Sequence, residues 1–247
     1  MGWTTDEFDM GYYRAWYIDV DSIDGELKEL IDQYIVEICY ADEFYTIQNA
    51  KNYIKDYLKS DDEDRKKGAI AEFIIHVFMK KQGYTQECLY KNLEEKSPKK
   101  GFDGVYVDSN GIIWYMESKS GSNKSKTHKD KVQEAYRDLK DKFAGNVKND
   151  PWTNALNHAK VVGASNTILN VFRKYSVEYE QHNSLNVEDF NVLPCGTLYK
   201  DDSSKVYVAK NIIDDVDSYF KRKNQKGLGV ICITQQTISE FEAYLNN

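Results

Sequence analysis

The stretch GFDGVYVDSNGIIWYMESK, residues 101–119, reads as two short β-strands joined by a tight turn at residues 109–111. In a strand, the side chains of residues i and i+2 point to the same face. Glu117 and Lys119 therefore lie side by side, directly after an apolar run. Because buried charge is costly unless it is paired or bound to a metal, this acid and this base indicate a functional site.

The length of the turn decides whether Asp103, near the start of the first strand, joins that pair. A two-residue Asn-Gly turn would pair Asp103 with Ser118 and place it on the face opposite Glu117. A three-residue loop with Gly111 in the left-handed conformation would pair Asp103 directly with Glu117. Both registers are compatible with the sequence. We favour the three-residue loop because it gathers the charged side chains on one face.

Two carboxylates and a lysine in this arrangement suit metal-assisted phosphodiester hydrolysis. Asp103 and Glu117 would bind a hard divalent cation, Mg²⁺ or alternatively Mn²⁺, with the backbone carbonyl of Ser118 as a further ligand. The cation would lower the pKa of a bound water and neutralise charge on the phosphate. Lys119 would orient the attacking water, help to deprotonate it, or stabilise the charge of the transition state.

A helix is expected over residues 60–82, ended by Gly83. Its segment 69–79 is almost entirely apolar, so the helix should be buried on most sides. Glu72 is the exception, and a lone buried acid is expensive unless it lies beside a metal cluster. We therefore predict that Glu72 reaches the acids of the hairpin and holds a water next to the metal, or a second metal.

These residues resemble the PD-(D/E)xK nuclease superfamily. Asp103, Glu117 and Lys119 match its motif, and Glu72 matches the extra acid on its first helix. The proline usually found in the motif is absent, and a glycine and a phenylalanine precede Asp103. More narrowly, FDGVYV followed by WYMESK is similar to the small nuclease subunit of the Hachiman antiphage defence system, over about residues 65–140. The resemblance implies a restriction-endonuclease-like core, DNA as the substrate and a co-encoded helicase subunit as partner.

The pattern of apolar residues along the chain predicts an α/β fold, with a mixed central β-sheet flanked by helices. Further helices are expected at residues 26–40, 47–59, 129–143, 167–174, 211–223 and 237–245, and further strands at residues 15–20, 87–93, 159–164 and 227–234. Residues 176–208 give no clear pattern.

Charge is distributed unevenly along the chain, whose formal net charge is −7. Residues 1–64 hold 5 basic and 17 acidic side chains, a net of −12, whereas residues 65–150 hold 18 and 12, a net of +6. We therefore predict an acidic N-terminal extension, 1–64, and a nuclease-like domain, 65–247. The extension would contact a partner or shield the positive segment.

Basic residues around the motif fit a phosphate footprint. The lysines expected to contact nucleic acid are Lys99, Lys100, Lys124, Lys126, Lys129 and Lys131.

The composition also excludes some classes of protein. There is no apolar run of 18 residues, so no membrane-spanning helix is expected, and the N-terminus does not resemble a signal peptide. The four cysteines are widely spaced and form no CxxC pair, which is typical of reduced thiols in a cytoplasmic protein. No Walker-type phosphate loop is present, so any ATP-driven step would come from another protein.

We therefore predict a Mg²⁺-dependent deoxyribonuclease that is restrained on its own and released by a motor partner. Two alternatives remain open: an RNase-type toxin with the same fold, and a nucleic-acid or partner-binding module without catalysis. The intact Asp103, Glu117 and Lys119 disfavour the second. Replacing Glu117 with Ala should abolish cleavage. By relieving repulsion between carboxylates, it should also stabilise the metal-free protein.

Overall fold

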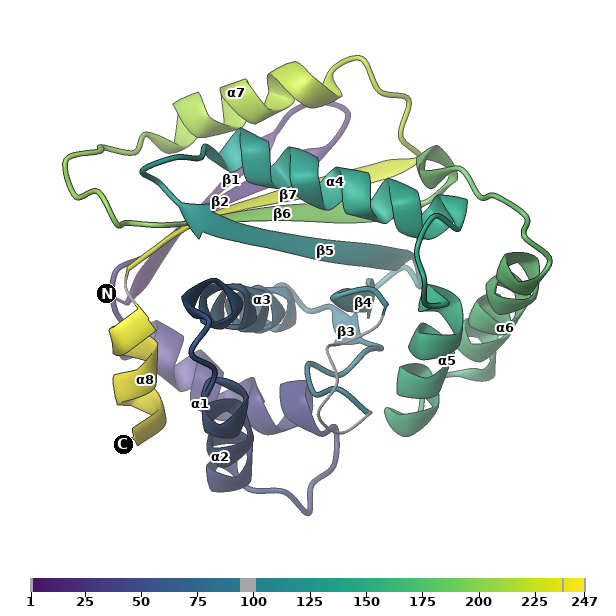
Figure 1. Ribbon diagram of the computed structural model, residues 1–247, viewed down its shortest axis with the longest axis horizontal. Coiled ribbons are helices and arrows are strands. Elements are labelled where there is room, and N and C mark those ends of the chain that lie inside the picture. The colour runs from purple at the N-terminus through teal and green to yellow at the C-terminus, as the bar shows by residue number, and fades with distance from the viewer. Residues whose placement is uncertain (1, 94–100, 237, 247) are drawn as a thin grey trace.

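A computed structural model describes residues 2–93, 101–236 and 238–246. Within these residues, eight α-helices flank one seven-stranded sheet with the strand order β1-β2-β7-β6-β5-β4-β3 (Figure 1). The strands are β1 (Trp3–Asp9), β2 (Arg14–Val20), β3 (Thr85–Gln86), β4 (Gly104–Val107), β5 (Ile113–Ser122), β6 (Asn191–Tyr199) and β7 (Gly227–Gln235). The predicted α/β fold with a mixed sheet is confirmed.

The centre of the sheet is parallel and its margins are antiparallel. β2, β7, β6 and β5 run parallel to one another. β1 is antiparallel to β2, and β4 and β3 extend the other edge in antiparallel fashion. The strand expected at residues 87–93 is absent from the described structure, where β3 ends at Gln86. The β4–β5 hairpin thus lies near one edge of the sheet, where the side chains at its open end can face a pocket.

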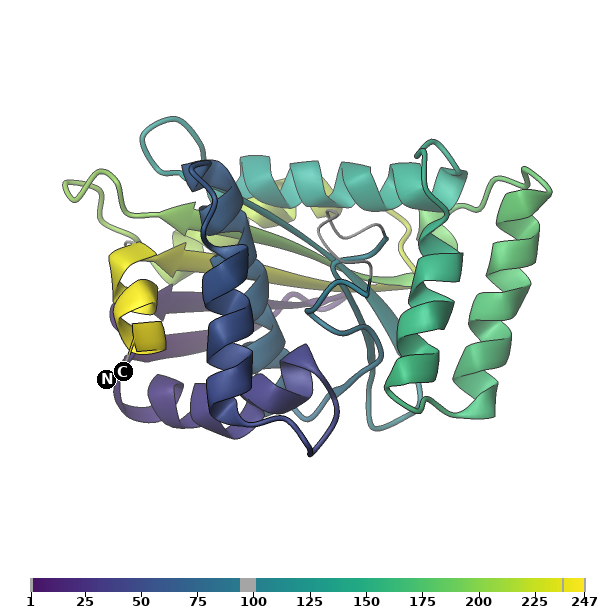
Figure 2. The ribbon, with the colours of Figure 1, turned by 60° about the horizontal axis from the view of Figure 1, so that its bottom comes forward.

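Helices cover both faces of the sheet (Figures 1 and 2). One core includes residues of α1 (Gly25–Cys39), α2 (Ile47–Tyr57), α3 (Glu63–Lys81) and α8 (Ile238–Asn246). The other includes residues of α4 (His128–Ala144), α5 (Pro151–Val161), α6 (Asn166–Glu180) and α7 (Ala209–Phe220), and a 3₁₀ turn spans Val187–Asp189. No helix within the described residues is long and apolar enough to cross a bilayer. The four cysteines are buried, and the described residues contain no disulfide.

The first 64 residues are built into this sheet. β2 pairs in parallel with β7, from Arg14 opposite Gly229 to Val20 opposite Gln235. Ile31 of α1 is fully buried in the same core as α3. This differs from the separate acidic extension expected from charge. The charge excess belongs to a segment that supplies two strands and part of a core.

A three-residue loop joins β4 to β5. The backbone N–H of Asp108 donates to the carbonyl of Ile112 at 3.0 Å, and the N–H of Gly111 donates to the carbonyl of Asp108 at 2.9 Å. Gly111 has a φ of +76°, which is the left-handed conformation. The loop predicted from the sequence is therefore confirmed.

The register of the hairpin follows from this loop. Gly104 pairs with Met116 in the antiparallel ladder, so the next position outward sets Asp103 opposite Glu117. Residues that stand directly opposite each other share a face of the sheet. Both carboxylates therefore project toward the layer that contains α4.

Helix α4 packs closely on β5 and β6 because Gly196 of β6 has no side chain. A Cβ atom at Gly196 would lie 2.9 Å from the carbonyl oxygen of His128 and 3.0 Å from the backbone nitrogen of Val132. The helix ends at Gly145, whose φ is +78°. Figure 2 shows that α5 and α6 stand beside this C-terminal end.

We predict that Gly111→Ala destabilises the protein by about 1 kcal/mol, because a Cβ atom disfavours the left-handed conformation. An added Cβ atom meets no atom within 4 Å, so the cost is conformational and not steric crowding. Gly111→Asn is the matched control, and it should cost less because Asn visits this conformation more readily. Urea unfolding of the three proteins measures the difference. Equal stability of the Gly and Ala proteins would contradict the account of the loop.

Candidate active site

Asp103 and Glu117 line one pocket of about 310 Å³, together with Lys119 and Lys142. Val147 and Asn149, between α4 and α5, and Pro151, the first residue of α5, contribute to its wall. The hairpin supplies both acids and Lys119, whereas Lys142 comes from the last turn of α4. The structure thus brings together the three residues that the sequence motif placed on one face.

Asp103 is half-buried, and its carboxylate is held by the neighbouring strand. Its Oδ2 accepts a hydrogen bond from the backbone N–H of Ser118 at 2.9 Å. Burial, and then the negative charges of Glu117 and Glu72, raise the pKa of Asp103 to about 7, while Lys142 and Lys119 oppose this increase. Asp103 therefore retains its proton at pH values at which an exposed aspartate has lost it.

Glu117 is held by two ammonium groups. Its side chain is 3% exposed, its Oε1 lies 3.1 Å from Nζ of Lys119, and its Oε2 forms an ion pair with Nζ of Lys142. Lys119 also forms an ion pair with Asp138 of α4 at 2.6 Å. Glu117 is therefore the buried centre of a charge cluster that also includes the carboxylates of Asp103 and Asp138 and the two ammonium groups.

The environment of Lys119 favours its charged form. Burial lowers the pKa of Lys119, but Glu117, Asp103 and Asp138 outweigh this effect and raise that pKa above its ordinary value. Lys119 is consequently an ammonium ion throughout the physiological pH range. In this state it can donate hydrogen bonds but cannot accept a proton.

Glu72 lies on α3 and does not line this pocket. Its Oε1 is 3.6 Å from Nε2 of His76, and Nδ1 of His76 is 2.7 Å from the hydroxyl of Tyr106. The charge of Glu72 nevertheless raises the pKa of Asp103. The predicted approach of Glu72 to the hairpin acids and its predicted role with a metal both stay predictions.

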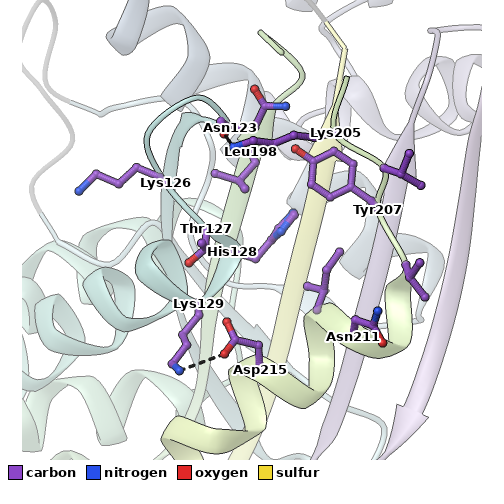
Figure 3. Close-up of a pocket in the computed structure, with 13 residues that line it drawn as sticks. Asn123, Lys126, Thr127, His128, Lys129, Leu198, Lys205, Tyr207, Asn211 and Asp215 are labelled. Carbon is purple, nitrogen blue, oxygen red and sulfur yellow. Dashed lines mark hydrogen bonds and ion pairs between the residues drawn. The ribbon is translucent and has the colours of Figure 1, made fainter. Parts of the chain in front are cut away.

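The predicted nucleic-acid-binding lysines are not gathered at the pocket. Lys99 and Lys100 lie outside the described residues. Lys124 is exposed in the loop before α4. Lys126 and Lys129 line a second pocket around the N-terminal end of α4 (Figure 3). Given the rise of an α-helix, Lys129 and Lys142 are about 20 Å apart along the axis.

Three of these lysines form ion pairs with acids, and the first of them, Lys126, has its Nζ 3.8 Å from Glu134. Nζ of Lys129 lies 3.0 Å from Asp215 of α7, and Figure 3 shows this pair among the residues that line the second pocket. Nζ of Lys131 lies 2.7 Å from Glu134. Contact with a phosphate would require these lysines to exchange one anionic partner for another.

Sequence reasoning missed Asp138 and Lys142. They are spaced i, i+4 on α4 and flank the buried stripe that contains Leu139 and Phe143. The i, i+4 spacing is visible in the sequence, but an ordinary surface ion pair has the same spacing. Only the packing of α4 on β5 shows that each residue instead pairs with a side chain of the hairpin.

We predict that Asp103→Asn stabilises the metal-free protein at pH 8 and has little effect at pH 4. In the unfolded chain an aspartate titrates near 3.9, whereas Asp103 in the fold titrates near 7. Between these values the native state binds more protons than the unfolded state, so the free energy of unfolding falls as pH rises. The variant removes this loss, which is on the order of 4 kcal/mol at most.

Urea unfolding in EDTA, at pH 4 and pH 8, tests this expectation. Asp61→Asn, which changes an exposed acid remote from the hairpin, is the control. The same stability change for Asp103→Asn at both pH values would contradict the raised pKa.

The comparison with protein families covers nearly the whole chain. The HamA family model matches residues 4–245. No curated protein is significantly similar to the chain. The match includes the hairpin, α3 and α4, so every described residue of the pocket lies within it. The chain therefore belongs to the HamA family, Hachiman defence system protein A, and is a component of Hachiman antiphage defence.

Proposed function

We propose that this HamA protein is a metal-dependent nuclease that cleaves DNA and acts as the effector of a helicase–nuclease defence complex. The observation that carries the proposal is the pairing of Asp103 opposite Glu117, with both carboxylates and Lys119 facing one pocket. This is the arrangement that the PD-(D/E)xK motif implies. DNA is the proposed substrate because the family serves antiphage defence and is associated with the HamB helicase.

The residues of the pocket fit a hard divalent cation. Carboxylate oxygens are the ligands that Mg²⁺ and Mn²⁺ prefer. Nζ of Lys142 forms an ion pair with Glu117, so this carboxylate is accessible to a positively charged group inside the pocket. In the described residues no three Asp, Glu, His or Cys side chains form a metal-binding group. Asp103, Glu117 and the carbonyl of Ser118 would therefore hold the cation with water completing its shell, as is usual for Mg²⁺.

A bound cation would activate a water and neutralise phosphate charge. Lys119, as an ammonium, would orient the attacking water or stabilise charge on the phosphate, because its raised pKa disfavours a role as proton acceptor. Asp138 fixes the position of that ammonium at 2.6 Å. Of the three roles predicted for Lys119, the contacts thus support positioning and charge stabilisation.

We predict that Glu117→Gln lowers the rate of DNA cleavage with Mg²⁺ by about 100-fold or more, which is typical of losing one group that stabilises transition-state charge. Duplex DNA, single-stranded DNA and tRNA should be compared, since cleavage of tRNA alone would indicate an RNase. Asp141→Asn, an exposed acid on α4, is the control. Wild-type cleavage by the Gln variant would contradict the proposed role of Glu117.

Glu117→Gln is a better variant than Glu117→Ala. The sequence alone predicts that Glu117→Ala stabilises the protein by relieving repulsion, but Glu117 is ion-paired with Lys119 and Lys142. Removing one partner of a buried pair leaves uncompensated charge and is strongly destabilising. The corrected expectation is therefore that Glu117→Ala lowers stability, and the amide retains the shape of the site.

We also propose that the HamB helicase relieves a restraint on this nuclease. Residues 1–64 carry the net charge of −12, and their ion pairs with later segments involve Lys80, Lys81, Lys200 and Lys67. In the described structure none involves Lys124, Lys126, Lys129 or Lys131. The acidic segment is thus available for contact with a partner, and the alternative that it shields these lysines has no support among these contacts.

We predict that DNA cleavage by the co-purified complex with HamB rises when ATP is added, because this chain has no nucleotide-binding loop of its own. The measurement compares this protein alone, the complex, and the complex with ATP. DNA affinity should also show a steeper salt dependence if lysines become available to phosphates. Equal cleavage in all three samples would refute the restraint without affecting the nuclease assignment.

A further inference from the structure

Within the described residues, Lys142 is ion-paired with fewer carboxylates than Lys119. Its side chain is 13% exposed, and its Nζ lies 5.9 Å from the centre of the Phe102 ring. Among the described residues its carboxylate partner is Glu117 alone, whereas Lys119 is shared between Glu117 and Asp138. If a divalent cation binds Glu117, Lys119 keeps an anionic partner and Lys142 loses its own.

A divalent cation would make the pocket strongly positive. Of the residues that line it, Asp103 and Glu117 supply two negative charges when ionised, and Lys119 and Lys142 supply two positive charges. A divalent cation then leaves two positive charges in excess. A phosphodiester group carries one negative charge, so it offsets part of that excess. An ammonium released from Glu117 inside this pocket is suitably placed to bind it.

We propose that Lys142 has two successive partners: it holds Glu117 in the metal-free protein and binds a phosphate oxygen of the nucleic acid once a divalent cation occupies Glu117. Lys142 is then a competitor of the metal and a substrate-binding residue of the same site. The inference rests on the proposed nuclease function, to which it adds a residue that the sequence motif does not contain.

The first test measures the affinity of the purified full-length protein for Mn²⁺ by electron paramagnetic resonance of the free ion. Lys142→Met removes the charge but keeps most of the aliphatic side chain, and it should bind Mn²⁺ about 10-fold more tightly because Glu117 no longer holds this ammonium. Lys140→Met is the matched control on the same helix, because Lys140 is exposed and makes no ion pair with the hairpin. Unchanged or weaker Mn²⁺ binding by Lys142→Met would overturn the proposal.

The second test measures binding of a fluorescein-labelled 20-base-pair duplex with a single-stranded overhang, in Ca²⁺ and in EDTA. A gel confirms that the probe stays intact. Lys142→Met should weaken binding about 10-fold in Ca²⁺ and leave it unchanged in EDTA, where Lys142 is engaged with Glu117. Lys140→Met should have the same small effect in both conditions. An effect of Lys142→Met that does not depend on the cation would indicate a structural role and refute the exchange of partners.

Two further variants of Lys142 separate the effect of its charge from an effect on folding. Lys142→Arg keeps the charge and should restore both Mn²⁺ affinity and DNA binding toward wild type. Lys142→Gln replaces the Met variant if thermal unfolding shows that Met disturbs the fold. A wild-type protein that cleaves no nucleic acid would refute the nuclease function, yet the Mn²⁺ measurement would still decide whether Lys142 competes with the metal.

Discussion

The direct pairing of Asp103 with Glu117 is the constraint on which the site depends. Side chains alternate between the faces of a strand, so a slip of one residue would turn Asp103 away from Glu117 and toward α3. The loop with left-handed Gly111 prevents that slip, and the carboxylate of Asp108 reinforces it by accepting hydrogen bonds from two backbone N–H groups of the loop. A surface turn about 15 Å from the acids therefore determines whether they meet.

The pairing brings the half-buried carboxylate of Asp103 beside the buried carboxylate of Glu117, and the surrounding charges compensate for both. Lys119 and Lys142 neutralise Glu117, while Asp103 relieves the remaining repulsion by a pKa near 7. Burying charges is tolerated when each has a partner, and removing one partner is costly. The metal-free site is thus stabilised by the same carboxylate–cation attraction that metal binding would use. If the proposed cation binds there, stability and metal affinity would be coupled through Glu117.

Local patterns were sufficient to predict the hairpin, its register and the residues Asp103, Glu117 and Lys119, because these depend on alternation and turn chemistry. They failed where tertiary packing overrides local signals. β6 was missed because Pro194 and Gly196 are unusual in a central strand. Its ladder with β7 has no pairs at residues 193–194, and Gly196 is needed for the approach of α4. The strand expected at 159–164 was wrong, since Asp150 caps a helix there that begins at Pro151.

The contrast between local patterns and tertiary packing also explains why sequence reasoning missed Asp138 and Lys142. Their identity as site residues depends on where α4 lies, and α4 is positioned by β6, a strand with almost no sequence signal. The close contact at Gly196 holds the helix against the sheet, and the helix then carries Lys142 to Glu117 about three turns later. A side chain introduced at Gly196 would push α4 outward and separate Lys142 from Glu117 without touching either residue. The motif therefore defines which charged side chains the hairpin carries, whereas the packing of α4 on β6 places Lys142 in its ion pair with Glu117.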